Sequence, residues 1–583
     1  MRYCRLLLIA GIIASTFCLG FLAYHFPWPA FIVGAVIVAR QIKRHGRNLF
    51  AHGTARWASV ADLERAGMLG GETGLIIGQV STQRPSFIRA LRDLFDSRVP
   101  AAEACERFVF SMRKLQPFHK AATVRLNRAV HTAVFAPTGV GKGVSLVVPF
   151  LLECPDSCVV IDPKGENARL TADHRRKLGY RVVLLDPFKV ATQTPDTFNP
   201  LDMIDENSPL ALDDCRAIAK EFVISTGTEP DPHWNLSSEN LISALIAATL
   251  FMPKENRSLQ TVRSLLTDTA RREFVLGKMR ESKEWGGMLA RIASMVMNWK
   301  DKELSGIIST ANRHLSFLDS LMIADSTSTS SFDPAALKTG KVTVYLILPP
   351  KHLKSQSALL RMWIGAMLRA CINGLDEQNK VHFILDEAAS LERMEVLEDA
   401  VDKYRAYGLR LQFYYQDIHQ LKQCWRDGLD QSLLSNTTQV YFGVQDYDTA
   451  EHVSNLLGEE TIIVDNGGTN TGGSTSANTQ DAGENVGRSW GANRGWAQQA
   501  RKLLKPEEVI GLPQCTAITV TPGMPPIATT LTRYYESGNE ITRWRLLRVR
   551  AEVWLAAVLM LGLSSFMGVW MTGILSHPVW RSR

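Results

Sequence analysis

The sequence of 583 residues has few cysteines, no internal repeat and no large excess of charge of either sign. Nine cysteines over this length exclude a disulfide-stabilised framework, and none forms a C-x-x-C pair. The cysteines and the thirteen histidines show no metal-ligand spacing, so we expect no structural metal and a reducing compartment. Hydrophobic residues make up 45% and charged residues 21%, which excludes a disordered chain, a collagen and a coiled-coil rod. The net charge of +7 permits an anionic partner without requiring one.

Charged residues are also absent from residues 6–39. One helix of this length would span about 51 Å, which exceeds a hydrocarbon layer of about 30 Å, whereas two full crossings need slightly more residues. Pro27 and Pro29 offer a turn and both flanks are basic, so we expect a tight membrane hairpin with both flanks inside. A cleaved signal peptide is the alternative, but the stretch is too long and has no A-x-A site. Residues 553–575 predict a further crossing, with a buried helix as the alternative.

A glycine-rich loop follows a β-prone run at residues 129–136 and leads into an apolar helix. In such a loop, glycines let backbone N–H groups converge on phosphate oxygens, and the helix N-terminus adds its dipole. We expect Lys142 to bind the transferring phosphoryl group. The strict GxxxxGK[ST] pattern fails twice, because Ala136 replaces the first glycine and Gly143 replaces the hydroxyl residue; an ordinary strand–turn–helix is the alternative. The predicted nucleotide-binding residues are Ala136, Pro137, Thr138, Gly139, Val140, Gly141, Lys142, Gly143 and Val144.

A second apolar run, residues 381–385, leads directly into Asp386 and Glu387. Carboxylates at the carboxyl end of a strand face the crevice in which α/β sheets bind ligands. We expect Asp386 to hold Mg²⁺ and Glu387 to orient the attacking water, although a polar strand end entering a helix cap is also common. The glycine-rich loop and the acidic pair occur in this order, with alternating strands and helices expected between them, and this arrangement favours an ATP site. A further run, 157–161, ends in Asp162-Pro-Lys-Gly-Glu166, where spacing alone does not decide between a turn and a second charged cluster.

Together these motifs resemble the type IV secretion and conjugation coupling proteins of the TraG/TraD class. A glycine after the loop lysine is usual in that family, and Asp386-Glu-Ala-Ala-Ser-Leu391 is similar to its DE-x-x-SL box. Further boxes follow in the family's order, and these are His52-Gly-Thr-Ala-Arg-Trp57, Asp162-Pro-Lys-Gly-Glu-Asn167, Asp186-Pro-Phe188, Phe198-Asn-Pro-Leu201, His233-Trp-Asn235, Tyr404-Arg-Ala-Tyr-Gly-Leu-Arg410, Gln416 and Leu504-Lys-Pro-Glu-Glu508. Two features depart from the family's pattern: the loop between the first two membrane helices is nearly absent, and the final apolar segment is additional.

The resemblance implies an α/β fold with a RecA-like P-loop NTPase core and an all-helical insert. The apolar segments described above add transmembrane helices at the amino and carboxyl ends. Residues 466–496 are dominated by Gly, Asn, Ser and Thr, so we expect a flexible insertion there. The expected domains are a membrane anchor at 1–47, the first part of the nucleotide-binding domain at 48–204, the all-helical insert at 205–335, the second part at 336–540 and a C-terminal transmembrane segment at 541–583.

The resemblance also implies a homo-hexameric ATPase that uses ATP and Mg²⁺ and lies in the bacterial inner membrane with its ATPase body in the cytoplasm. The partners it implies are a single-stranded DNA–relaxase complex or secreted effector proteins, type IV secretion channel components and inner-membrane lipid. Lys142, Glu387, Gln416 and Arg410 are the expected catalytic residues, with Gln416 as γ-phosphate sensor and Arg410 reaching a neighbour's nucleotide. The alternative for Gln416 is a residue that forms a turn at a strand end. The alternative for Arg405 and Arg410 is that both are surface charges. A docking receptor that binds ATP without hydrolysis and a double-strand DNA translocase are the other functions considered.

Overall fold

The computed structural model describes residues 53–71, 73–80, 121–224, 229, 231–372, 378–476 and 485–535. The chain consists of two units, Met1–Thr532 and Arg533–Arg583. The fold given below is that of the described residues of the first unit. The membrane segments predicted at 6–39 and 553–575 lie outside the described residues and stay predictions. Among the helices that are described, none is both long and apolar enough to cross a membrane.

The core of this unit is a mixed sheet whose described strands follow the order β2-β1-β13-β12-β9-β3-β8-β7-β4-β6-β5. The seven strands from β9 to β5 are parallel, and the four from β2 to β12 are joined by antiparallel pairs. The sheet strands are β1 (Leu75–Val80), β2 (Ala122–Leu126), β3 (His131–Phe135), β4 (Ser157–Ile161), β5 (Arg181–Leu185), β6 (Val342–Leu346), β7 (Val381–Asp386), β8 (Leu409–Tyr415), β9 (Thr437–Phe442), β12 (Thr516–Val520) and β13 (Ile527–Thr530). The parallel strands are mostly buried on both faces, which explains why they are apolar runs rather than alternating ones.

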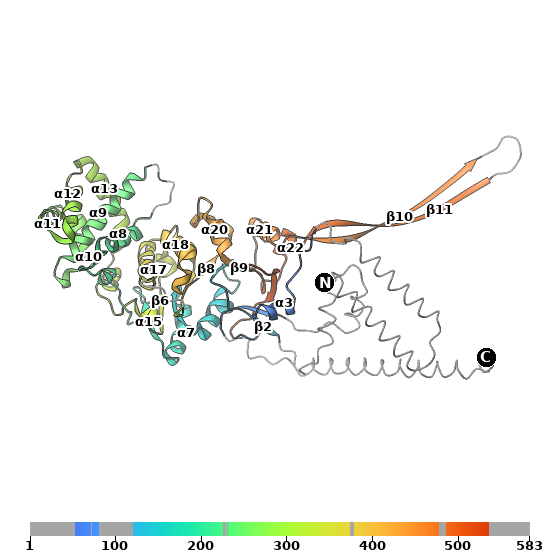
Figure 1. Ribbon diagram of the computed structural model, residues 1–583, viewed down its shortest axis with the longest axis horizontal. Helices are drawn as coiled ribbons and strands as arrows, with labels where there is room; N and C mark the ends of the chain where they lie inside the picture. The colour runs from blue at the N-terminus through green and yellow to red at the C-terminus, as the bar shows by residue number, and fades with distance from the viewer. Residues whose placement is uncertain are drawn as a thin grey trace. The chain divides into compact units, whose positions relative to one another are not determined.

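Helices connect the strands and cover the sheet (Figure 1). The helices around the sheet are α3 (Val60–Arg65), α6 (Val148–Glu153), α7 (Glu166–Lys177), α16 (Pro350–Leu353), α17 (Ser357–Cys371), α18 (Glu395–Lys403), α19 (Ile418–Cys424), α20 (Leu429–Asn436), α21 (Tyr447–Leu457) and α22 (Pro506–Ile510). Shorter turns are the π-helix η1 (Gly143–Val147) and the 3-10 helices η2 (Pro200–Met203), η3 (Lys254–Asn256), η4 (Glu284–Gly287), η5 (Ser316–Leu318), η6 (Ala388–Leu391) and η7 (Tyr404–Tyr407). The π-helix η1 runs directly into α6, so one continuous helical segment begins beside Lys142 and ends before Cys154.

Between β5 and β6 the described chain contains helices joined by turns and loops, and no strand. Its helices are α8 (Ala211–Phe222), α9 (His233–Leu250), α10 (Leu259–Thr267), α11 (Thr269–Glu281), α12 (Met288–Met297), α13 (Asp301–Leu315), α14 (Leu321–Ser326) and α15 (Ala336–Thr339), and Figure 1 shows α9 to α13 gathered in one group. Residues Leu241 to Leu250 of α9 are buried, so this apolar run is a core helix. Trp234 packs on α13, because a Cβ added at Gly306 would lie 2.5 Å from its ring.

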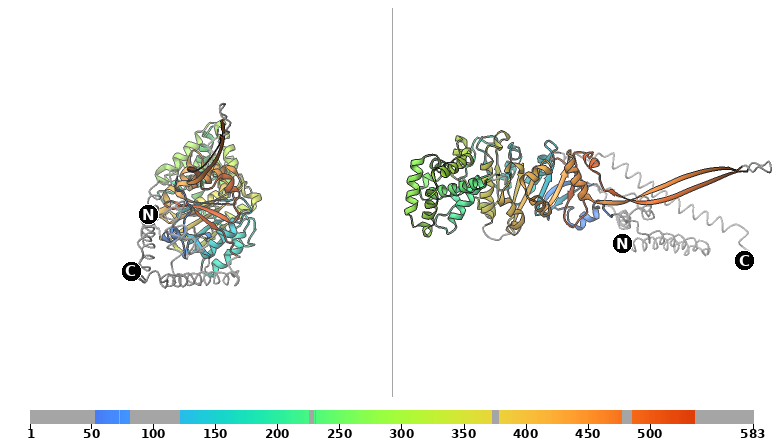
Figure 2. Two further views of the ribbon diagram at one scale, coloured as in Figure 1. Left: turned by 90° about the vertical axis from the view of Figure 1, so that its right-hand side faces the viewer. Right: turned by 90° about the horizontal axis from the view of Figure 1, so that it is seen from above.

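A long two-stranded ribbon, β10 (Glu459–Ser476) and β11 (Asn485–Lys502), occupies most of the segment expected to be a flexible insertion (Figure 2). Its antiparallel register runs from Glu459 opposite Lys502 to Ser476 opposite Asn485. Residues 466–476 and 485–496 are therefore strands rather than irregular chain. Backbone hydrogen bonds between strands do not require apolar side chains, which is why composition alone did not reveal the pairing.

Because the seven strands are parallel, the connections that follow their carboxyl ends lie on one side of the sheet and those that precede their amino ends lie on the other. All carboxyl ends meet at one side, here called the carboxyl edge, and all amino ends at the other, the amino edge. The glycine loop, residues 136–143, follows β3 at the carboxyl edge, and Asp162, Glu387 and Gln416 follow β4, β7 and β8 there. Since β3, β8, β7 and β4 are consecutive neighbours, these four connections lie side by side.

Candidate functional site

The glycine loop joins β3 to the helical segment that begins with η1. It leaves the sheet while still paired to it, because the Ala136 N–H donates to the Tyr415 carbonyl at 3.0 Å. Gly139 and Gly141 have φ angles of +88° and +102°, in the left-handed region that other L-residues rarely adopt. A Cβ at Gly139 would have no heavy atom within 4 Å, so the loop faces open space at that point. This is the geometry that lets backbone N–H groups surround a phosphate.

The glycine loop also packs tightly against the end of β9. Val140 is 9% exposed, and a Cβ added at Gly443 would lie 2.8 Å from Val140 Cγ1. Gly443 has a φ of +61°, so its position requires glycine for both steric and backbone reasons. The contact holds the loop from the β9 side.

The side chain of Lys142 folds back from the end of the glycine loop to its first residue. Its ammonium group donates to the Ala136 carbonyl at 2.9 Å. Burial lowers the pKa of Lys142, and the charges of Asp386 and Glu387 oppose that effect. The lysine therefore lies in the field of both predicted acids, as a residue that neutralises phosphate beside a metal must.

Asp386 is the last residue of β7, and Glu387 follows it in a left-handed conformation with φ 105° and ψ 54°. Burial raises the pKa of Asp386 to about 6, while Lys142 and a hydrogen bond from Asn167 lower it. A positive φ at a residue other than glycine costs on the order of 1–3 kcal/mol and is found most often at functional sites. Here the Ser390 hydroxyl and N–H both donate to the Glu387 carbonyl, at 2.7 and 3.0 Å, and hold the turn.

Gln416 reaches the same place from β8. Its side-chain amide donates to Glu387 Oε1 at 3.5 Å, and its own N–H donates to Gln420 Oε1 at 2.9 Å. The structure thus brings together Lys142, Asp386, Glu387 and Gln416 at the carboxyl edge.

Asn167, in the first turn of α7, is a member of this site to which the sequence assigned no role. It is 4% exposed and hydrogen-bonds to Asp386. A Cβ added at Gly143 would lie 3.9 Å from Asn167 Oδ1, so Asn167 also faces the start of η1. The available signal was its place in the Asp162–Asn167 box, directly after a strand that turns out to be the neighbour of β7.

Asp162 holds the start of α7, and it also lies close enough to Asp386 for its charge to raise the pKa of that residue. The Asp162 carboxylate accepts the Ala168 N–H at 2.8 Å. Burial raises the pKa of Asp162, against the backbone hydrogen bonds from Ala168, Asn167 and Glu166. Gly165, with φ 65°, provides the sharp turn into the helix. Since Asn167 lies in the turn that Asp162 fixes, Asp162 positions Asn167 against Asp386.

Arg410 lies at the opposite edge from these residues. It is the second residue of β8 and pairs in register with His382, whereas Gln416 follows the last residue of β8. At about 3.3 Å per residue the two are roughly 20 Å apart. Arg410 is 9% exposed, and its guanidinium donates to the carbonyls of Leu409 and Arg405 at 2.9 and 3.3 Å. Arg410 therefore cannot reach the site of its own chain, and a role toward a neighbour's nucleotide stays a prediction.

Comparison with known proteins identifies relatives of this chain. The family model described as "Type IV secretory system Conjugative DNA transfer" matches residues 56–554. The conjugal transfer protein TraG of Escherichia coli is 28% identical over 491 residues, covering 80% of this chain and 72% of TraG. The coupling protein VirD4 of Bartonella quintana is 28% identical over 414 residues, or 68% of this chain. The chain spans only 62% of that VirD4 and 61% of a TraG from Rhizobium radiobacter.

Solved structures show the same fold. The unbound coupling protein TrwB superposes with a TM-score of 0.54 at 17% identity, covering 72% of this chain and 89% of TrwB. TrwB in complex with ADP and Mg²⁺ gives 0.52 at 18% identity, covering 70% and 86%. The fold is therefore that of an α/β P-loop NTPase with a mixed sheet. Because the family model matches most of its length, the chain belongs to the type IV secretory system conjugative DNA transfer family.

Proposed function

We propose that this protein is a Mg²⁺-dependent ATPase that couples ATP hydrolysis to the passage of macromolecules into a type IV secretion channel. The observation that carries the proposal is the convergence of Lys142, Asp386, Glu387 and Gln416 from three neighbouring strands. The TrwB complex with ADP and Mg²⁺ supports the choice of ligand, as does the order of the parallel strands, which fits a RecA-like core. The open glycine loop fits a phosphate chain, and the buried Asp386 carboxylate, with its raised pKa, fits a site built for a cation.

In this proposed mechanism the residues of the carboxyl edge divide the work of binding and hydrolysis. Lys142 and the N–H groups of the glycine loop would hold the β- and γ-phosphates, and Asp386 would hold Mg²⁺, which supplies charge neutralisation when bound. Glu387 would orient the attacking water and accept its proton. Gln416, hydrogen-bonded to Glu387 Oε1, would transmit the loss of the γ-phosphate to α19. Asn167 would keep the Asp386 carboxylate in position through its hydrogen bond.

The partners follow from the family. We infer a cargo of single-stranded DNA bound to a relaxase, or of secreted effector proteins, and docking to the secretion channel from the inner membrane. Anchoring would use residues 1–47 and 541–583, and a homo-hexameric ring would surround the cargo. A strand held by its phosphates is bound without sequence preference, so DNA affinity should fall steeply with salt.

The test is nucleotide hydrolysis by the full-length protein carrying Lys142→Ala. We expect hydrolysis to fall by at least a hundredfold, since the main phosphate-binding charge is lost. Lys177→Ala, at an exposed position in the last turn of α7, is the matched control and should hydrolyse ATP like the parent. Unchanged hydrolysis in Lys142→Ala would reject the assigned loop.

A docking receptor that binds ATP without turnover is the second candidate function. It is favoured by one observation, the glycine at position 143 where a magnesium-binding hydroxyl would stand. Measuring ATP binding and turnover with and without single-stranded DNA separates the two, because a receptor would bind nucleotide but not hydrolyse it under either condition.

A further inference from the structure

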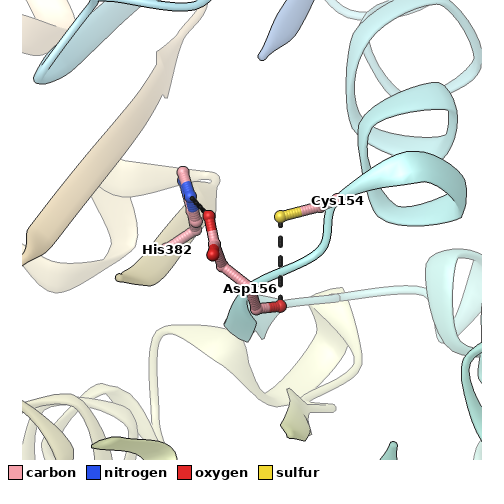
Figure 3. Close-up of side chains that lie close together, drawn as sticks. All are labelled: Cys154, Asp156 and His382. Carbon is pink, nitrogen blue, oxygen red and sulfur yellow. Dashed lines mark hydrogen bonds and ion pairs between the residues drawn. The ribbon is translucent and has the colours of Figure 1, made fainter. Parts of the chain in front are cut away.

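A second cluster of chemically reactive side chains lies at the amino edge of the sheet. Cys154 follows α6, Asp156 precedes β4 and His382 is the second residue of β7. The His382 Nε2 and Asp156 Oδ2 atoms are 3.0 Å apart, and the Cys154 sulfur lies within 4.8 Å of a carboxylate oxygen of Asp156 and of a ring nitrogen of His382. Figure 3 shows the three side chains converging from these elements. A thiol, a carboxylate and an imidazole are the side chains from which proteins build zinc sites.

A buried arginine fixes the segment that carries two of the three side chains. Arg175 is fully buried and donates to the carbonyls of Cys154 and Asp156, the latter at 2.7 Å. Its Nε donates to Thr343 Oγ1 at 2.9 Å. The third side chain, His382, is packed edge-on against the ring of Phe150, with 5.0 Å between ring centres. The cluster is therefore held in place from both sides, as a pre-formed binding site is.

Among the described residues, the contacts of the Cys154 sulfur are long. Its sulfur is 3.9 Å from the Asp156 carbonyl and 3.9 Å from the Cys158 sulfur. The hydrogen bond with Cys158 and burial raise the pKa of the Cys154 thiol. A coordinated thiol is deprotonated, and binding would release that proton to solvent.

We propose that Cys154 Sγ, Asp156 Oδ and His382 Nε2 bind a zinc-class divalent cation. With bond lengths of about 2.0–2.3 Å, ligand atoms in a tetrahedral site are about 3.3–3.8 Å apart, so the present positions need to move by only about 1 Å. A cavity of about 60 Å³ borders all three residues and has room for a water in the fourth position. Two basic residues, Lys380 and Arg410, line the same cavity. The charge of the bound ion would be balanced by the Cys154 thiolate and the Asp156 carboxylate, which together carry two negative charges.

The position of this site gives the metal a structural role. The segment that ends at Cys154 begins at Lys142, about 18 Å away along the helix. The strand that carries His382 ends at Asp386, about 13 Å away. A metal here would tie together the amino-edge ends of the two elements that carry the glycine-loop lysine and the acid, and would stabilise the fold without contacting nucleotide.

The experiment is titration of chelator-treated, reduced full-length protein with Co²⁺, followed by displacement with Zn²⁺. We expect one tightly bound Co²⁺ per chain with a thiolate-to-cobalt charge-transfer band, and a higher melting temperature with Zn²⁺. His382→Gln should weaken binding at least tenfold, and Cys154→Ser should abolish the band. Cys515→Ser, which removes an exposed thiol, should leave the band unchanged.

Two results would overturn the proposal. One is the absence of the charge-transfer band in a folded parent protein. The other is a band that persists unchanged in both Cys154→Ser and His382→Gln. Because a buried cysteine substitution can impair folding, His382→Gln is checked by circular dichroism and by nucleotide binding, which lies at the other edge and should be retained. If the second result occurs and Asp386→Asn removes the binding, the ion lies at the nucleotide site and the proposal is rejected.

Discussion

Asp386 imposes a stability cost on the empty protein that its replacement by asparagine should remove. Burial raises its pKa from 3.8 to about 6, even with Lys142 and the Asn167 hydrogen bond acting in the opposite direction. The difference corresponds to about 3 kcal/mol of destabilisation at neutral pH. Asparagine has nearly the same shape and no charge. We therefore expect Asp386→Asn, without nucleotide or metal, to be more stable than the parent and unable to hydrolyse ATP.

The difference in stability between Asp386→Asn and the parent should depend on pH, because Asp386 titrates in the parent only. The folded chain binds the Asp386 proton more tightly than the unfolded chain, so the parent loses stability as pH rises from about 4 to 6. The advantage of Asp386→Asn should be complete at pH 7.5 and reduced to about a third at pH 4.5. In a cooperative unit of several hundred residues, about 1 kcal/mol shifts the melting temperature by about 1 °C. Differential scanning fluorimetry should therefore show a gain of about 3 °C at pH 7.5.

Mg²⁺ and ADP should reverse the order, because the parent carboxylate binds the metal and the amide binds it poorly. Asp173→Asn, at an exposed position on α7, is the control for removal of a carboxylate outside the site and should hydrolyse ATP like the parent. A melting-temperature difference between Asp386→Asn and the parent that is equal at both pH values would refute the desolvation argument. A less stable Asp386→Asn at pH 7.5 would refute it as well.

Three further substitutions test the geometry by calorimetric titration with Mg²⁺ and ADP. Gly143→Ser should fold and bind with equal or higher affinity, since position 143 is helical and a Cβ there lies 3.9 Å from Asn167 Oδ1; a large loss would show that glycine is required. Gly443→Ala should weaken binding at least tenfold, because its Cβ would lie 2.8 Å from Val140 Cγ1 at a φ of +61°, and unchanged affinity would contradict that contact. Arg410→Ala should change the affinity less than twofold, since it lies at the amino edge; a large loss would contradict its placement.

The parallel half of the sheet could be predicted because its strands are apolar runs of five to seven residues bounded by turn residues. The run at 157–161 coincides with β4, and the run at 381–385 forms β7 together with Asp386. The antiparallel extension was harder to foresee. Only part of β2 is buried, and β13 alternates buried and exposed residues over four positions, a signal too short to distinguish from a loop. Their place in the sheet depends on pairing between segments that are distant in sequence.

The nucleotide site was predictable where a single rule applied. Lys142, Asp386 and Gln416 all end or follow parallel strands, and such ends meet at one edge. Asn167 needed more than this rule, since its role depends on β4 lying beside β7 and on the helix turn that Asp162 fixes. The left-handed backbone of Glu387 has no sequence signal, because the surrounding structure imposes it. The Cys154 cluster was missed for a similar reason: its third member lies more than two hundred residues away.

Position within a strand decides what Arg410 can do. The Tyr404–Arg410 box ends at the second residue of β8, and Gln416 comes just after the carboxyl end of that strand. Arg410 and Gln416 therefore lie at opposite ends of β8. Arg410 therefore shares a cavity with His382 rather than with Lys142. An arginine finger in this family member would have to come from a residue whose side chain reaches beyond its own subunit. Arg405 is exposed in η7 whereas Arg410 is buried, so of the two arginines Arg405 better meets that requirement.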